Sequence, residues 1–300
     1  MVKFGVDVGG TTIKIGLFEE NGNLIEKYEI STDKSEQGKH IIDDITTFLK
    51  RILAERGLNT HDCKGVGIGL PGPVDEEGNI LGCVNLGWGI FQVEREISEK
   101  MSGVRVKAAN DANVAALGEQ TAGAGRGMKN MVMVTLGTGV GGGIISNGKI
   151  LAGANGGAGE IGHMTVNCQE EELCSCGKKG CLEQYASATG IVRMVGMLRK
   201  QEDYSAKDIF DKAKQGDDLC LKAVHELGRY LGLALANTAC VVNPEGIVIG
   251  GGVSRAGQIL LSEIEKYFQE YVFGPCRNVR FMLAELGNDA GIYGAAALIV

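Results

Sequence analysis

The feature of this sequence that most constrains its fold is a short stretch containing one histidine and three cysteines. His163, Cys174, Cys176 and Cys181 follow the spacing H-x10-C-x-C-x4-C. Zinc prefers tetrahedral nitrogen and sulfur ligands, and one imidazole with three thiolates is one of its closed structural sets. The spacing therefore predicts a structural zinc site. The alternative is a cluster of reduced thiols beside an ordinary surface loop.

Two glycines and two glutamates accompany these ligands. Gly177 and Gly180 allow the tight loop that closely spaced cysteines require. Glu160 lies three residues before the histidine and Glu183 two residues after the last cysteine. A metal in this loop would hold both carboxylates rigidly at a pocket wall. The alternative is that they are only the solvated charges of a surface loop.

Composition excludes several classes of protein. The net charge of -7, without a basic run, argues against nucleic acid or a membrane surface as the main partner. We find no signal-peptide pattern and no apolar run long enough to span a bilayer. Nine cysteines, an odd number and mostly scattered, indicate a reducing compartment with metal binding rather than disulfides. We therefore expect a cytoplasmic protein.

One pattern occurs three times along the chain: an apolar strand followed by a glycine turn. The first copy has Asp7 on the strand and Gly9-Gly10-Thr11-Thr12 in the turn. Glycine lets a backbone approach a phosphate closely, and an aspartate beside it suits a magnesium ion; the alternative is a plain hairpin turn. The second copy, at 131–146, suggests an internal duplication, and the third ends at Gly250-Gly251-Gly252. None fits the P-loop or Rossmann motifs.

Helix-period segments alternate with these strands, which indicates an α/β fold. The pattern predicts helices near 41–52, 187–200, 207–215, 217–240, 257–272 and 290–300.

Taken together, the motifs resemble those of the ROK sugar kinases, a family within the actin-like ATPase superfamily. The likeness runs in family order over essentially the whole chain. Within the family, the stretch after Cys181 looks most like the bacterial ATP-dependent glucokinases. The matching motifs are Asp7-Val8-Gly9-Gly10-Thr11, Asn110-Asp111, Leu136-Gly137-Thr138-Gly139, Glu160-x-Gly162-His163 and C-x-C-G-x-x-G-C-x-E ending at Glu183.

The resemblance implies a two-lobed, actin-like (ribonuclease H-like) α/β fold with a central cleft and a structural zinc loop. The smaller lobe would comprise residues 1–118 and a C-terminal helix at 289–300. The larger lobe, residues 119–288, would carry the zinc loop.

It also implies that Asp111 is the catalytic base, taking the proton from the 6-hydroxyl of the sugar as that oxygen attacks the γ-phosphate. A carboxylate suits this task because positioning matters more than strong basicity. Asp111 could instead be only a helix N-cap, a role that Asn110 or Asn113 could also fill.

The other residue roles follow from the same resemblance. Sugar hydroxyls would be bound by Asn110, Glu160, His163 and Glu183, while Gly72 and Asn85 would close the pocket. Asp7 would hold Mg²⁺ through water. The phosphates of ATP would lie against Gly9, Gly10, Thr11, Thr12, Thr138 and Gly139, and the adenosine near Gly251 and Gly252.

The activity implied is ATP-dependent phosphorylation of glucose at the 6-hydroxyl, by a homodimer or homotetramer. The alternatives are a kinase for fructose, mannose, allose or N-acetylmannosamine, and a sugar-sensing regulator of the same family. Such regulators carry a helix-turn-helix segment ahead of the first glycine turn. Because only six residues precede Asp7, we expect an enzyme rather than a regulator.

Overall fold

The computed structural model describes residues 1–198 and 204–300. The chain divides into two compact units, each described here by itself. Unit 1 comprises Met1–Arg126, Ile150–Ala158 and Asn288–Val300, and unit 2 comprises Gly127–Lys149 and Gly159–Gly287. This division differs from the predicted one, which ended the first lobe at 118. That position lies inside a helix, Asp111–Ala122, which stays whole in unit 1.

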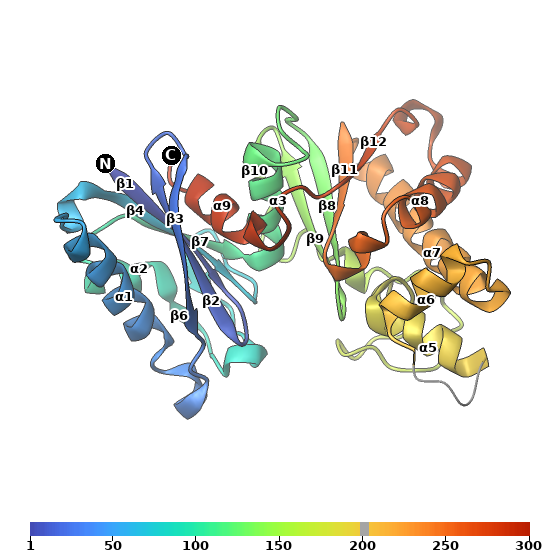
Figure 1. Ribbon diagram of the computed structural model, residues 1–300, viewed down its shortest axis with the longest axis horizontal. Helices are drawn as coiled ribbons and strands as arrows, with labels where there is room; N and C mark the ends of the chain where they lie inside the picture. The colour runs from blue at the N-terminus through green and yellow to red at the C-terminus, as the bar shows by residue number, and fades with distance from the viewer. Residues whose placement is uncertain (199–203) are drawn as a thin grey trace. The chain divides into compact units, whose positions relative to one another are not determined.

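Unit 1 is built on a five-stranded sheet in the order β3-β2-β1-β4-β7 (Figure 1). Strand β2 is antiparallel to β1 and β3, whereas β4 and β7 continue the sheet in parallel with β1. The carboxyl ends of three strands therefore meet at one edge of the sheet. The strands are β1 (Val2–Val8), β2 (Thr12–Glu19), β3 (Leu24–Ser31), β4 (Cys63–Leu70) and β7 (Val106–Asn110).

Helices cover both faces of this sheet, and the side-chain alternation of β1 explains how. Phe4, Val6 and Val8 point into an apolar core that they share with α1 (Ile41–Glu55) and α2 (Val93–Lys100). Small residues occupy the other face, and there α9 (Ala290–Ala297) packs against β1, β4 and α3 (Asp111–Ala122). Asp7 belongs to this second face.

Unit 2 is built on a second five-stranded sheet, in the order β10-β9-β8-β11-β12. Strand β9 is antiparallel to β8, whereas β11 and β12 run parallel to β8. Side chains of α7 (Asp218–Val242) and α8 (Gln258–Tyr271) form the main core with β8 and β11. Figure 1 shows both helices beside this sheet. The strands are β8 (Met131–Leu136), β9 (Val140–Ser146), β10 (Lys149–Ile150), β11 (Gly246–Gly250) and β12 (Arg280–Leu283).

The two sheets have the same topology, which supports the internal duplication suggested by the sequence. In each, the central strand pairs with an antiparallel hairpin partner on one side and with a parallel strand on the other, and that strand pairs with a second parallel strand. In this correspondence β8 matches β1, so the Gly137-Thr138-Gly139 turn matches the Gly9-Gly10-Thr11 turn. The third glycine turn follows β11, which matches β4.

The predicted helices are present, with shifted ends. They are α5 (Ala188–Leu198), α6 (Ala206–Lys214), α7 (Asp218–Val242) and α8 (Gln258–Tyr271). Residues 199 and 200 of the helix predicted over 187–200 lie outside the described residues. The last helix ends at Ala297 rather than at Val300. Side chains of unit 1 bind the carbonyls beyond it: Lys3 Nζ donates to Ile299 O and Arg105 Nη1 to Val300 O.

Candidate functional site

The parallel strand ends of unit 1 bring several predicted site residues to one edge of the sheet. Asp7 lies next to Gly69 in the β1–β4 register, and Leu70 lies next to Asn110 in the β4–β7 register. Loops that leave the carboxyl ends of parallel strands are the usual place for ligands in α/β sheets. Gly72 follows the end of β4, Asn110 is the last residue of β7, and Asp111 begins α3 directly after it.

Asn110, and not Asp111, is the N-cap of α3. The Oδ1 of Asn110 accepts hydrogen bonds from the backbone N–H groups of Ala112 (3.0 Å) and Asn113 (3.3 Å). Its Nδ2 lies 3.5 Å from Gly72 O. Asp111 is the first residue of the helix, and its Oδ1 accepts from the N–H of Ala112 at 2.7 Å. The interpretation of Asp111 as the N-cap residue is therefore wrong.

Asp7 is a buried carboxyl group at the same edge. Burial, and after it the negative charge of Asp111, raise the pKa of Asp7 to about 6, while Lys14 opposes this shift. A Cβ atom on Gly291, near the start of α9, would lie 2.4 Å from Asp7 Oδ2, so only glycine leaves room for the carboxylate there. The two acids are thus neighbours that repel each other, an arrangement common where a cation binds.

The first glycine turn joins β1 to β2 in a closed, hydrogen-bonded form. The N–H of Gly9 donates to Thr12 O at 3.0 Å. Thr32 binds the turn from β3's end, donating from its N–H to Thr11 O (2.9 Å) and from its hydroxyl to Gly9 O (2.7 Å). These bonds use carbonyl oxygens of the turn. Gly10 is half-buried and Thr11 is exposed.

In unit 2, two glycine turns line a pocket of about 460 Å³. Gly137 and Thr138 follow β8, and Gly252 follows β11. Gly251 has φ +82°, and a Cβ atom there would lie 2.5 Å from Leu136 O, so glycine is required where the two strand ends meet. The rest of the lining is Ala188, Ala206, Lys207, Phe210, Asp211, Lys214, Val253, Arg255 and Ala256.

Unit 2 also brings the four predicted metal ligands together. The ligand atoms of His163, Cys174, Cys176 and Cys181 all lie within 4.8 Å of one another. The Sγ atoms of Cys176 and Cys181 are 3.6 Å apart, and His163 Nδ1 lies 3.8 Å from Cys174 Sγ. Ligands about 2.3 Å from a tetrahedral zinc are separated by about 3.8 Å. The donor set and its spacing therefore fit a closed four-coordinate ion.

The loop around this cluster is held by backbone contacts. Gly180 has φ +74°, and its backbone lies so close to Asn167 that a Cβ atom would lie 1.8 Å from Asn167 O. Lys178 Nζ donates to His163 O at 2.9 Å. The tight loop predicted from the glycines is confirmed, and Lys178 is a contact that the sequence pattern did not indicate.

Glu183 connects the metal cluster with the second glycine turn. Its Oε1 accepts from Cys174 Sγ (2.8 Å) and from Ser175 Oγ (3.0 Å), and it lies 3.9 Å from His163 Nδ1. On the other side, a Cβ atom on Gly139 would lie 2.7 Å from Glu183 Oε2. The predicted sugar-binding and phosphate-binding segments of unit 2 are therefore adjacent, with Glu183 between them.

Two predicted residues lie outside these clusters. Glu160 is exposed and precedes the 3₁₀ turn Ile161–His163, where its carbonyl accepts from His163 N–H at 3.1 Å. Asn85 is exposed in the 3₁₀ turn Val84–Leu86 of unit 1. The structure gives neither side chain a ligand contact, so both roles stay predictions.

The pocket wall formed by α6 and Arg255 escaped the sequence analysis. The helix itself was predicted near 207–215, but its packing beside the Gly252–Ala256 turn depends on tertiary structure. The available signal was Arg255, a basic residue three positions after the third glycine turn.

Among the described residues, no helix is both long and apolar enough to cross a membrane.

Comparison with known proteins identifies the family. The ROK family model matches residues 3–300. The chain is 45% identical to a glucokinase of Halalkalibacterium halodurans, over 98% of this chain and 94% of that protein, and 37% identical to a glucokinase of Thermotoga maritima, over 98% and 96%. A ROK family glucokinase from Streptomyces griseus, solved with glucose and AMPPNP, is 34% identical with a TM-score of 0.77, covering 99% of both chains. The chain therefore belongs to the ROK family and has the actin-like fold that its motifs predicted.

Proposed function

We propose that this protein is an ATP-dependent glucokinase, which transfers the γ-phosphoryl group of ATP to the 6-hydroxyl of glucose. The observation that carries the proposal is the 45% identity to a glucokinase over 98% of the chain. The chemistry of the site residues supports it, because they include a candidate base, hydroxyl-binding groups and phosphate-binding turns.

Asp111 is the proposed general base. Its carboxylate would accept the proton of the 6-hydroxyl while that oxygen attacks the γ-phosphorus. Since the hydroxyl needs only partial deprotonation in a loose transition state, a well-placed weak base suffices. That Asn110 supplies the helix cap supports this role, because Asp111 is not required for capping.

Sugar hydroxyls are the proposed partners of Asn110, Glu160, His163 and Glu183, with Gly72 and Asn85 at the pocket rim. Carboxylates accept from paired hydroxyls, whereas an amide both donates and accepts. Asn110 uses its Oδ1 on the helix cap and one hydrogen of Nδ2 on Gly72 O, so the second hydrogen of Nδ2 is the one offered to the sugar.

We propose zinc as the ion of the Cys3His cluster. Held by four protein ligands, it would have no open coordination position, and its role would be structural. His163 faces the thiols with Nδ1, which leaves Nε2 as a donor toward the sugar. The cluster would thereby position His163 and both glutamates.

ATP would bind through the glycine turns, with Gly9, Gly10, Thr11, Thr12, Thr138 and Gly139 at its phosphates. The pocket of unit 2 that includes Gly252 would take the adenosine, with Gly251 shaping its floor. Mg²⁺, held by Asp7 through water, would neutralise charge on the phosphates during transfer. The enzyme is proposed to work in the cytoplasm as a homodimer or homotetramer.

A coupled ADP-release assay with ATP and magnesium tests this function. The panel should contain glucose, fructose, mannose, allose and N-acetylmannosamine, and the zinc content should be measured on the same preparation. We expect a strong preference for glucose with about one zinc per chain. Preferred turnover of another sugar would reassign the substrate, because one misplaced hydroxyl leaves buried partners unpaired. Absence of turnover with every sugar, from folded and zinc-loaded protein, would refute the kinase proposal.

A further inference from the structure

The ten residues between His163 and Cys174 contain an acidic run that the proposed chemistry does not use. We call residues 164–173 the arm; it joins the histidine ligand of the metal cluster to the first cysteine ligand. Glu170, Glu171 and Glu172 follow one another within it. Glu170 keeps only 12% of its side-chain surface exposed. A carboxylate so shielded from water needs a partner.

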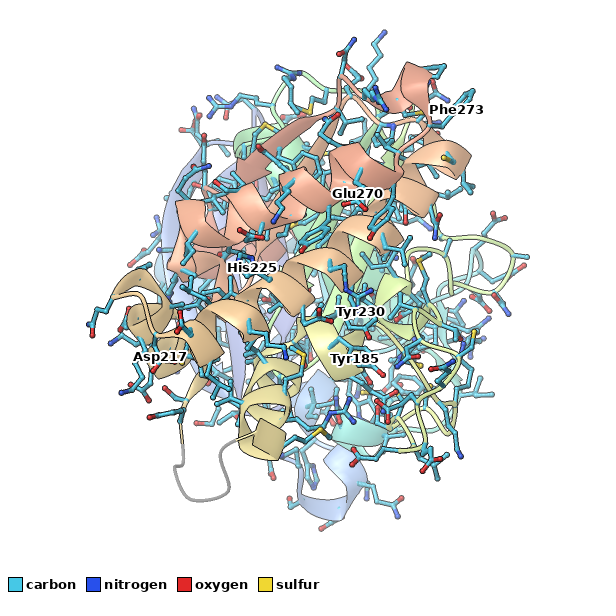
Figure 2. The ribbon with its side chains drawn as sticks, turned by 90° about the vertical axis from the view of Figure 1, so that its right-hand side faces the viewer. Tyr185, Asp217, His225, Tyr230, Glu270 and Phe273 are labelled. Carbon is cyan, nitrogen blue, oxygen red and sulfur yellow. The ribbon has the colours of Figure 1, made fainter. Side chains whose placement is uncertain are left out.

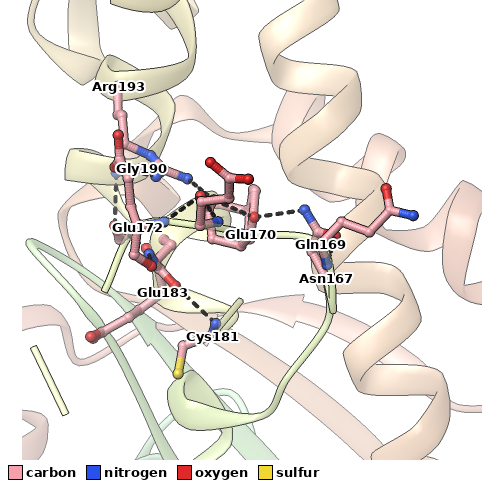
Figure 3. Close-up of polar contacts among 12 residues, drawn as sticks. Asn167, Gln169, Glu170, Glu172, Cys181, Glu183, Gly190 and Arg193 are labelled. Atoms are coloured by element: carbon pink, nitrogen blue, oxygen red, sulfur yellow. Dashed lines mark hydrogen bonds and ion pairs between the residues drawn. The ribbon is translucent and has the colours of Figure 1, made fainter. Parts of the chain in front are cut away.

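That partner is Arg193, on α5. Its Nη2 donates to Glu170 Oε2 at 2.7 Å and its Nη1 to Glu172 Oε2 at 2.6 Å (Figure 3). The Arg193 side chain is 21% exposed, so its contact with Glu170 is largely shielded from solvent, whereas Glu172 is 59% exposed. The arginine hydrogen bond, with a second from Tyr185, lowers the pKa of Glu170 to about 2. One guanidinium thus holds two points of the arm.

A second set of contacts joins the arm to the short helix α4 (Glu183–Ala186). The hydroxyl of Tyr185 donates to Glu170 and accepts from Asn167 Nδ2 at 2.9 Å. Gln184 spans the same two segments, because its Nε2 donates to Glu172 O (3.1 Å) and its Oε1 accepts from Cys181 N–H (3.0 Å). The arm, the last cysteine ligand and α4 are therefore one connected network (Figure 3).

This network rests on the core of unit 2. Tyr185 is buried, and its ring stacks on Tyr230 of α7 with centroids 4.1 Å apart (Figure 2). The guanidinium of Arg193 also lies over the Tyr185 ring, 5.4 Å from its centroid. Tyr185 follows Glu183 by two residues on the same short helix, so movement of Tyr185 moves the proposed sugar-binding carboxylate.

We propose that Arg193 is a positioning residue: by holding Glu170 and Glu172 it fixes the arm against Tyr185, and so sets the place of Glu183 and of the metal ligands His163 and Cys174. The inference rests on the proposed sugar phosphorylation. Arg193 would act through these neighbours and would not touch the sugar. Its loss would leave Glu170 shielded and without a positively charged partner, a state that favours release of the arm into water.

The test compares Arg193→Met, Arg193→Lys and a matched control, Arg229→Met. Arg229 also pairs with a glutamate, Glu226 at 2.6 Å, and lies over a tyrosine ring, Tyr230 at 4.3 Å, but both of these partners belong to its own helix, α7. The control therefore removes a similar arginine–glutamate–aromatic cluster without touching the arm.

Two readouts are measured on zinc-loaded protein. The first compares the change in the KM for glucose with the changes in the KM for ATP and in kcat. The second needs no activity: the rate of tryptic cleavage after Lys178 and Lys179, two exposed lysines between the last two cysteine ligands. For Arg193→Met we expect a rise of about tenfold in glucose KM and in cleavage rate, the loss expected for one charge-assisted hydrogen bond. ATP KM and kcat should change less than about twofold, Arg193→Lys should recover part of the loss, and Arg229→Met should resemble wild type.

The outcomes separate this inference from the proposed function. Cleavage and glucose KM that stay at wild-type values in Arg193→Met would overturn the positioning role. The positioning role would also be overturned if the KM for glucose and the KM for ATP rose, and kcat fell, by equal factors together with a lowered Tm, because such changes indicate general destabilisation. If wild-type protein phosphorylates no sugar, the proposed function fails, and the cleavage rates alone decide whether Arg193 holds the arm.

Discussion

Replacement of Asp7 by asparagine should stabilise the protein against unfolding above neutral pH while removing its activity. The Asp7 carboxyl has a pKa raised from 3.8 to about 6, first by burial and then by the charge of Asp111. A raised pKa means that the folded state binds the proton more tightly than the unfolded state. The resulting stabilisation is fully present below pH 3.8 and is lost as the pH rises through about 6.

The magnitude follows from the shift. One pKa unit corresponds to about 1.36 kcal/mol, so ionised Asp7 disfavours the folded state by about 3 kcal/mol at pH 8. Between pH 4.5 and pH 8 the same two pKa values give a change of about 2 kcal/mol. Asparagine has similar shape and does not titrate, so the free-energy difference between Asp7→Asn and wild type should grow by that amount over this range.

Urea unfolding followed by tryptophan fluorescence measures this difference. Trp88 is the single tryptophan of the chain and belongs to unit 1, as Asp7 does, so its signal reports on the relevant unit. Magnesium and nucleotide are left out, because a bound cation would favour the ionised carboxylate. Zinc is kept constant, and its own pH dependence cancels between variant and wild type.

A free-energy difference that does not change between pH 4.5 and pH 8 would refute the reasoning about Asp7. The same curves in an Asp111→Asn background provide the control. Removing the charge of Asp111 lowers the pKa of Asp7, so in this background the unfolding free-energy difference caused by Asp7→Asn should grow less with pH. If that difference grows as much as it does with Asp111 present, burial alone accounts for the pKa shift.

Two further substitutions test the glycine turn and the metal loop. Gly251→Ala should destabilise unit 2 by about 1–3 kcal/mol in urea unfolding and raise the KM for ATP, because φ is +82° and the added Cβ would meet Leu136 O. Gly257→Ala is its control, with φ +76° but open space around the Cβ, and equal effects of both on ATP KM would contradict the account of the pocket. Cys176→Ala should lower zinc content and mainly raise the KM for glucose, whereas Cys168→Ala, exposed and outside the ligand set, should do neither. A zinc-free Cys176→Ala with wild-type glucose kinetics would count against the positioning role of the metal loop.

Local patterns were enough to predict much of this fold. The alternation of Phe4, Val6 and Val8 and the glycine turns predicted the central strands, and the duplicated strand–turn pattern appears as two sheets of equal topology. The metal ligands could be predicted because a fixed spacing of soft donors has few other uses. Such signals are contained within one segment of the chain.

Features that depend on contacts between distant segments could not be predicted in this way. The boundary after residue 118 was placed inside α3, because nothing local shows that Gly118 packs against Ala290 and Gly294 of α9. Arg193 lies in an ordinary helical segment, and only the folded loop shows that it pairs with Glu170 and Glu172.

The central claim is that Asp111 assists transfer of the γ-phosphoryl group to the 6-hydroxyl of glucose. The most direct measurement is ³¹P and ¹H NMR of the product formed from ATP and glucose by wild type and by Asp111→Asn, with sugar binding measured on both by calorimetry. We expect a phosphate ester coupled to the two C6 protons from wild type. The variant should bind glucose normally and give at least about 10² less product, the scale of general-base catalysis. A phosphate on another oxygen, or a variant that keeps wild-type turnover, would contradict the account.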